Sequence, residues 1–180
     1  ITLTLTNFVT NSSTVAVAYT ANSDASKQLS DASGNTVASN SSLSSITVTN
    51  DTNAPTVSAV SSNTADGPYN IGDVIQIAVA FSEVVTVTGT PQLTLETGTT
   101  DRTADYASGS GSDTLVFNYT VQSGDTTSDL AYTGASSLAL NGGTILDNAN
   151  NSATLTLPAV GGTGSLSNAS AVVVDGVRPV

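Results

Sequence analysis

The 180-residue sequence contains no cysteine, histidine, methionine or tryptophan. The absence of cysteine excludes disulfides and thiol chemistry. Without histidine or cysteine, a nucleophile–base triad has no usual base. Glu83 and Glu96 are a conceivable carboxylate pair for glycoside hydrolysis, but nothing in the sequence places them across a cleft. We therefore expect a protein that is not an enzyme.

Positive charge is also scarce. The sequence has three Lys and Arg residues against 14 Asp and Glu residues, and its formal net charge is −11. Nucleic-acid binding relies on Lys and Arg to displace phosphate counterions, and anionic lipid surfaces attract the same residues. No apolar run approaches the roughly 18 residues of a membrane-spanning helix. We expect no nucleic-acid partner and no direct membrane insertion.

What the chain has in abundance is Thr, Ser, Asn and Gly, together with apolar residues that alternate with polar ones. Period-two alternation is typical of strands with one buried face. The clearest runs are Ile1–Leu5, Val15–Tyr19, Ile75–Phe81, Gln92–Glu96 and Leu115–Val121, and turns rich in glycine separate many of them. The pattern predicts an all-β fold, with about seven to nine strands between Pro55 and Val174 forming an antiparallel β-sandwich.

A short phrase occurs twice, each time after a strand-like run: Asp51-Thr52-Asn53-Ala54-Pro55 and Asp175-Gly176-Val177-Arg178-Pro179. An Asp-x-x-x-Pro phrase repeated at domain spacing predicts the junctions of a tandem array. We therefore divide the chain into the C-terminal part of a preceding repeat (1–50), a junction (51–55), a complete module (56–174) and the start of the next junction (175–180).

Residues 1–50 hold too few predicted strands to close a sandwich by themselves. One interpretation is that the rest of that module lies before the sequence given. The other is that a strand from another subunit completes the module, which is an established mode of recognition. Truncation is the more economical of the two.

Strand direction predicts which acidic side chains meet. The strand Thr56–Val60 runs away from the first junction, and the strand Asp73–Phe81 returns to it. Glu83 follows the returning strand, so it should lie beside Asp51 and Asn53. By the same reasoning, the opposite end of the module should bring together Asp66, Asp73 and Asp175.

Carboxylate and amide oxygens of this kind are the ligands that calcium prefers. A cation between facing carboxylates would remove their repulsion and stiffen the joint between modules. The alternative is that these residues are turn formers in a solvated hinge, since Asp and Asn favour turns. The sequence favours calcium at the junctions.

A second phrase also recurs, as Asp31-Ala32-Ser33-Gly34-Asn35 and as Asp147-Asn148-Ala149-Asn150-Asn151. Its candidate metal ligands are Asp31, Asn35, Asp147 and Asn151. The spacing is shorter than an EF-hand loop and lacks the terminal Glu. A tight turn with Gly or Asn in the left-handed conformation explains the phrase, and that interpretation is favoured here.

Five segments carry a resemblance to a known family: Tyr69–Ile75, Phe81–Glu96, Tyr106–Gly111, Leu115–Val121 and Leu138–Ile145. They resemble the bacterial Ig-like repeats of very large surface and secreted proteins, including giant adhesins and the surface protein that some marine cyanobacteria need for swimming. The resemblance covers roughly residues 51–180, and residues 11–50 resemble the tail of a related repeat. The resemblance implies an extracellular array of Ig-like β-sandwiches, often rigidified by calcium. Asn150 stands where the earlier loop has Gly34, so ligand geometry does not transfer between the loops.

Together these observations favour a non-catalytic structural or adhesive repeat of a large extracellular bacterial protein at the cell surface, with neighbouring modules of the same chain as partners. The alternative is a subunit that assembles with identical copies into an extracellular filament or sheath by strand exchange. A carbohydrate-binding module is less favoured, because the chain has no Trp and only five Tyr to stack on sugars.

Overall fold

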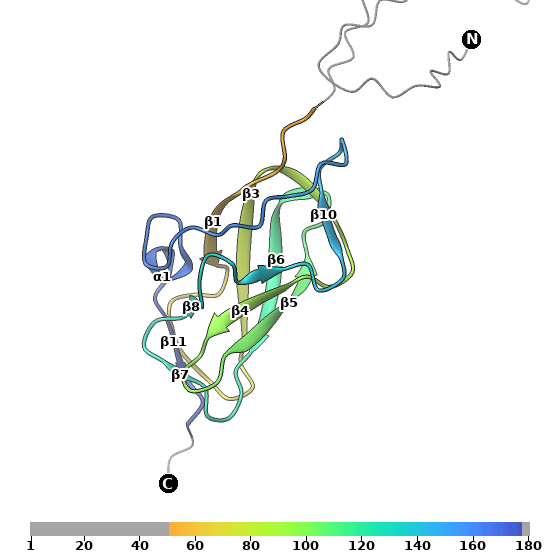
Figure 1. Cartoon of the computed structure of the whole chain (residues 1–180). Helices are drawn as coiled ribbons and strands as arrows, with labels where there is room; N and C mark the ends of the chain where they lie inside the picture. Colours follow the sequence, from red (N-terminus) through yellow and green to blue (C-terminus); the bar gives the residue numbers. More distant parts are fainter. Residues whose placement is uncertain (1–50, 178–180) are drawn as a thin grey trace, which may run out of the picture. The chain divides into compact units, whose positions relative to one another are not determined.

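The computed structural model describes residues 51–177 of the chain, and β-strands are the main secondary structure of this part (Figure 1). The prediction of an all-β fold is confirmed for this part. The boundary between the two units of the chain falls after Thr52. The predictions for residues 1–50, including Asp31 and Asn35 as metal ligands, lie outside the described residues. Among residues 51–177, none of the helices is long and apolar enough to cross a membrane.

The larger sheet is antiparallel and curls on itself (Figure 1). Its main path has six strands, in the order β1, β3, β6, β5, β4, β8, and two short strands pair beside this path, β10 with β3 and β9 with β4. The strand bounds are β1 (Val57–Ser62), β3 (Val74–Thr88), β4 (Gln92–Glu96), β5 (Arg102–Ser108), β6 (Ser112–Thr120), β8 (Ala131–Tyr132), β9 (Leu138–Ala139) and β10 (Thr144–Leu146).

The core lies inside this curl. In β3 the odd-numbered side chains form the inward row, and Ile75, Ile77, Val79, Phe81 and Val85 are all buried. The facing strands contribute the same alternation, with Leu93, Leu95, Leu115, Phe117 and Tyr119 buried in one cluster with them. The period-two pattern of the sequence therefore identifies the core correctly.

A second, three-stranded sheet joins segments that are far apart in the sequence. Its order is β2 (Gly67–Asn70), β11 (Val172–Asp175) and β7 (Thr126–Thr127). β11 pairs parallel with β2 and antiparallel with β7. The short helix α1 (Leu166–Ala169) contacts β1 and β8, and its Leu166 side chain is buried in the core cluster.

The chain enters and leaves this module at opposite ends (Figure 1). The N-terminal segment reaches β1 at one end, and β11 leads out at the other. β3 runs the length between them, and its 15 residues span roughly 45 Å at the rise of an extended strand. We call these the N-terminal end and the C-terminal end of the module.

Three details differ from the sequence prediction. β3 does not end at Phe81 but continues to Thr88, so Glu83 lies within a strand rather than after it. Leu155 and Leu157 also alternate with polar residues in the sequence, but this segment forms no strand. Isolated bridges join Thr154 to Thr56 and Ser152 to Leu146 instead. Residues 51–177 contain eleven strands rather than about seven to nine, and three of these strands are only two residues long.

Candidate metal centre

Glu83 lies on the inward row of β3, between Phe81 and Val85. Both neighbours in that row are buried, and Glu83 itself is half-buried. The register between β3 and β6 shifts between Ala80 and Val85, so the strand bends at this point. A carboxylate in an apolar row costs free energy unless charge or hydrogen bonds compensate it. Glu83 therefore lies at the edge of the core, on the side of the N-terminal end of the module.

The segment that enters the module is fastened next to Glu83. Ser82 makes two hydrogen bonds with Thr56: its hydroxyl accepts from the Thr56 N–H at 3.0 Å, and its own N–H donates to the Thr56 carbonyl at 2.8 Å. Pro55 is buried, and its carbonyl accepts from the Thr154 N–H at 2.7 Å. These contacts fix the path of the chain immediately after the first junction.

Asp147 supplies a second carboxylate from the turn after β10. Its side chain is only 5% exposed. The Oδ1 atom accepts from the N–H groups of Ala149 and Asn151, both at 2.8 Å, and Oδ2 accepts from Asn151 Nδ2 at 2.7 Å. Asn150 has a φ of 67°, the left-handed conformation predicted for this turn. The predicted tight turn is therefore present at 147–151, and its geometry leaves Asp147 available as a metal ligand.

These hydrogen bonds keep Asp147 charged. Burial acts to raise the pKa of its carboxyl, but the side chain of Asn151 and the backbone N–H groups of Asn151, Ala149 and Asn150 outweigh it, and the pKa is lowered. An ionised carboxylate has about four lone-pair sites, so Oδ2 retains capacity to accept another partner. The turn thus holds a fixed negative charge at the N-terminal end.

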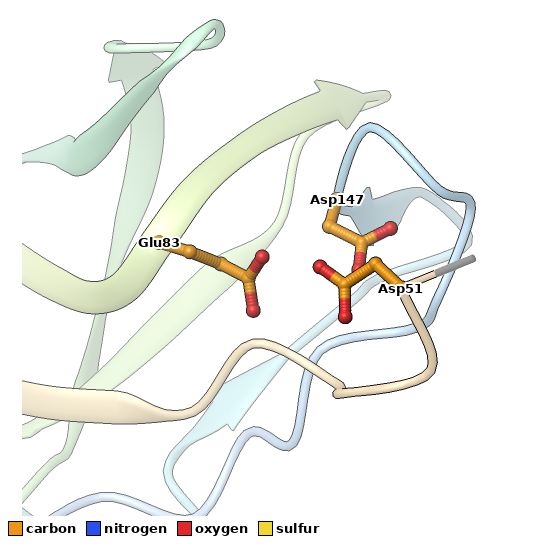
Figure 2. Close-up of side chains that lie close together, drawn as sticks. All are labelled: Asp51, Glu83 and Asp147. Atoms are coloured by element: carbon orange, nitrogen blue, oxygen red, sulfur yellow. The ribbon is translucent and has the colours of Figure 1, made fainter. Parts of the chain in front are cut away.

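Asp51, Glu83 and Asp147 converge on one point (Figure 2). Each offers a carboxylate oxygen, and these atoms lie within 4.8 Å of one another. The three come from the first junction, from β3 and from the turn after β10. Asn53 lies alongside, because its carbonyl accepts from Asn151 Nδ2 at 3.2 Å. Strand direction predicts the meeting of Asp51 and Glu83; the sequence did not indicate that Asp147 joins them.

This acidic group has the composition of a metal site. Its donors are all hard oxygen atoms, and the sequence has no histidine or cysteine to favour a softer metal. Three carboxylates this close repel one another, and a cation between them converts the repulsion into attraction. The cluster of Asp51, Glu83 and Asp147 can therefore hold a metal ion.

The other acidic candidates lie at the opposite end of the module. Asp73 Oδ2 accepts from the Asn70 N–H at 2.8 Å, and Asp175 pairs with Asn70 in the parallel register. Asp66 is placed elsewhere than predicted. Its Oδ1 accepts from the Ala171 N–H at 2.8 Å at the beginning of β11, whereas Asp175 is the last residue of that strand. The prediction for Asp66 was wrong because the length of β2 separates Asp66 from the C-terminal end of the module.

Asp125 is a further charged residue of the module that was not predicted from the sequence. It is 1% exposed, and its Oδ1 accepts from Arg102 Nε at 2.8 Å. Its Oδ2 accepts from the Tyr119 hydroxyl at 2.6 Å and from the Gln122 N–H at 2.9 Å. The sequence shows Asp125 only as part of a Ser-Gly-Asp turn. The only sequence signal for this ion pair was the scarcity of positive charge. An arginine within a strand of so acidic a chain is expected to pair with a carboxylate.

Within this network the pKa of Asp125 is lowered and the pKa of Tyr119 is raised. Burial acts to raise the pKa of Asp125, but the hydrogen bonds from Tyr119, Arg102 and Gln122 lower it overall. Burial, and then the adjacent Asp125 carboxylate, raise the pKa of Tyr119. Asp125 is thus ionised and Tyr119 neutral at physiological pH, as an ion pair with a supporting hydroxyl donor requires.

Comparisons with protein-family models, with curated proteins and with solved structures find no match for this chain.

Proposed function

We propose that the chain is a non-catalytic structural or adhesive repeat of a large extracellular bacterial protein, stiffened by calcium at its module junctions. The observation that carries this proposal is the convergence of Asp51, from the junction, with Glu83 and Asp147, from the module. A cation held by all three ties the path of the incoming chain to the body of the module. The Ig-like character of the sandwich and its tandem arrangement belong to the same proposal.

Calcium fits this donor set better than magnesium. Calcium takes about six to eight oxygen ligands in flexible geometry, and three carboxylates with a nearby backbone carbonyl approach that number. Magnesium demands a near-ideal octahedron and retains several of its waters. Extracellular calcium sites are often weak, with dissociation constants of about 0.1 to 1 mM. A site formed partly by the exposed Asp51 belongs in that class.

The path of the chain supports the extender role. The module receives the chain at one end and releases it at the other, so copies joined in series would form an extended array (Figure 1). The composition agrees, because the net charge of −11 and the many neutral polar residues suit a solvated surface protein. The segments that resemble bacterial Ig-like repeats point to the same class of protein.

A thermal titration of the intact chain tests the calcium site. The chain has two glutamates, so Glu83→Gln has a matched control in Glu96→Gln. Calcium at about 100 times its dissociation constant stabilises the folded state by about 2.7 kcal/mol through mass action. We expect wild type and Glu96→Gln to melt at a higher temperature in calcium than in chelator. Glu83→Gln should lose most of this shift.

The same titration distinguishes a metal site from a hydrogen-bonded cluster. In chelator, Glu83→Gln removes one of three mutually repelling carboxylates, so it should melt no lower than wild type. In calcium it should melt below wild type. A calcium response equal to that of magnesium, or a response that Glu83→Gln retains, contradicts the proposed site.

A further inference from the structure

We propose that the module also carries tension along the chain, through a clamp between its first and last strands. We define this terminal clamp as residues 57–70, which contain β1 and β2, together with residues 164–175, which contain α1 and β11. The inference takes the direction of the load from the proposed extender function. It does not depend on the metal, because the clamp contains none of the three residues of the acidic group.

The clamp arises from the direction of the strands. β2 and β11 are parallel, with Gly67 opposite Val172 and Asn70 opposite Asp175. The chain enters at the N-terminal end ahead of β1 and β2, and it leaves at the C-terminal end directly after β11 (Figure 1). Tension on the two ends therefore pulls the first strands and the last strand in opposite directions, each along its own axis.

Hydrogen bonds join the two sides of the clamp along its length. The Val60 N–H donates to the Gly164 carbonyl at 2.7 Å, and the Ser62 N–H donates to the Ser170 hydroxyl at 2.9 Å. Further along, the Gly67 N–H donates to the Ala171 carbonyl at 3.1 Å. Asp66 bonds the Ala171 N–H, and the parallel ladder continues to Asp175. These bonds lie side by side across the direction of pull.

The exit of β11 is fastened separately. The Gly176 N–H donates to the Asp125 carbonyl at 2.6 Å, and the Gly176 carbonyl accepts from the Gly124 N–H at 2.9 Å. The Asp125 side chain is in turn held by Arg102 and Tyr119. The last strand cannot fray from its free end while this loop holds it. Val172 and Val174 are also buried in the core cluster.

This arrangement sets how the module yields. A strand pulled along its axis loads all its cross-strand bonds at once, so they must break together. A strand pulled sideways from one end loses them one at a time, each at a lower force. Forced unfolding is governed by the unfolding rate rather than by equilibrium stability. The parallel clamp should therefore slow unfolding selectively when the load runs from end to end.

Single-molecule unfolding of the intact chain at constant force tests this inference. The chain has no native cysteine, so introduced pairs give unique attachment points. Asn53→Cys with Val177→Cys applies the end-to-end load. Thr99→Cys with Val177→Cys applies a sideways load, because the turn after β4 and the exit of β11 both lie beside residues 124–126. We expect unfolding about tenfold slower in the first geometry at the same force.

A matched pair of serine variants tests the bonds themselves. Ser170→Ala removes the hydroxyl that accepts the Ser62 N–H inside the clamp. Ser110→Ala removes a hydroxyl that accepts the Val87 N–H, also at 2.9 Å, outside it. Under end-to-end load in chelator, Ser170→Ala should unfold about fivefold faster than wild type, the full effect of losing one hydrogen bond from the native state. Ser110→Ala should remain close to wild type.

Equal unfolding rates in the two attachment geometries would overturn the clamp, as would equal effects of the two serine variants. The geometry test uses the wild-type clamp and does not depend on whether Ser170→Ala folds. A chain without a calcium response that still shows the directional difference would retain the clamp and lose the proposed metal joint. The two proposals therefore fail separately.

Discussion

The Gly176 N–H donates to the Asp125 carbonyl at 2.6 Å, which fastens the second junction phrase to the 122–125 turn of the module. The first phrase has Thr52 at the equivalent position, and that residue is exposed. The two phrases share Asp and Pro, but glycine occurs only where the chain approaches the 122–125 turn. Glycine at 176 is thus explained by close backbone contact at the exit of β11.

Gly176→Ala should destabilise the module. A Cβ at this position would lie 2.2 Å from the Gln122 carbonyl oxygen and 2.7 Å from that of Asp125. Overpacking of this kind costs about 1–3 kcal/mol, and backbone atoms have little freedom to move away. The control is Gly134→Ala, where no heavy atom lies within 4 Å of the added Cβ. Urea unfolding followed by circular dichroism should show a lower midpoint for the first variant only.

Removal of the Tyr119 hydroxyl should cost more than removal of the Tyr132 hydroxyl. Both tyrosines are 1% exposed, but Tyr119 donates to the Asp125 carboxylate and Tyr132 to the Pro158 carbonyl. Hydrogen bonds to charged groups contribute about 1.5–3 kcal/mol, and neutral ones about 1 kcal/mol. Tyr119→Phe should therefore have the lower urea midpoint. Equal midpoints would show that the Asp125 charge adds nothing to this hydrogen bond.

Acid should weaken the module in part through Asp147. Its folded-state pKa lies below the unfolded value of about 4, because hydrogen bonds favour the carboxylate. This contribution to stability is present above pH 4 and is lost as pH falls through the lower, folded-state pKa. In chelator, the unfolding free energy of Asp147→Asn should fall less steeply below pH 4 than that of wild type. A slope equal to that of wild type would contradict the pKa assignment.

The sequence was sufficient for the central strands and for one pair of site residues. Alternation in Ile75–Phe81 and Leu115–Val121 identifies the central strands, because one face of each is buried. Counting strand directions from the first junction places Glu83 beside Asp51. That inference works because a strand that returns antiparallel to β1 must arrive near the point where β1 begins.

The remaining parts depend on contacts that local patterns do not encode. Asp147 reaches the site because β10 pairs with the far half of β3, and no periodicity in residues 144–146 specifies that pairing. Asp66 was misplaced because a four-residue strand, β2, follows its turn and pairs with β11. The Arg102–Asp125 ion pair spans 23 positions between a strand and a loop, so neither residue carries a local signal of it.

We propose that a cation bound by Asp51, Glu83 and Asp147 stiffens the joint between the preceding segment and the module. The most direct test measures the distance distribution between spin labels at Lys27→Cys and Asp113→Cys by double electron–electron resonance, in calcium and in chelator. We predict a distribution that narrows in calcium for wild type and stays broad in both conditions for Glu83→Gln. A wild-type distribution of the same width with and without calcium would contradict the claim.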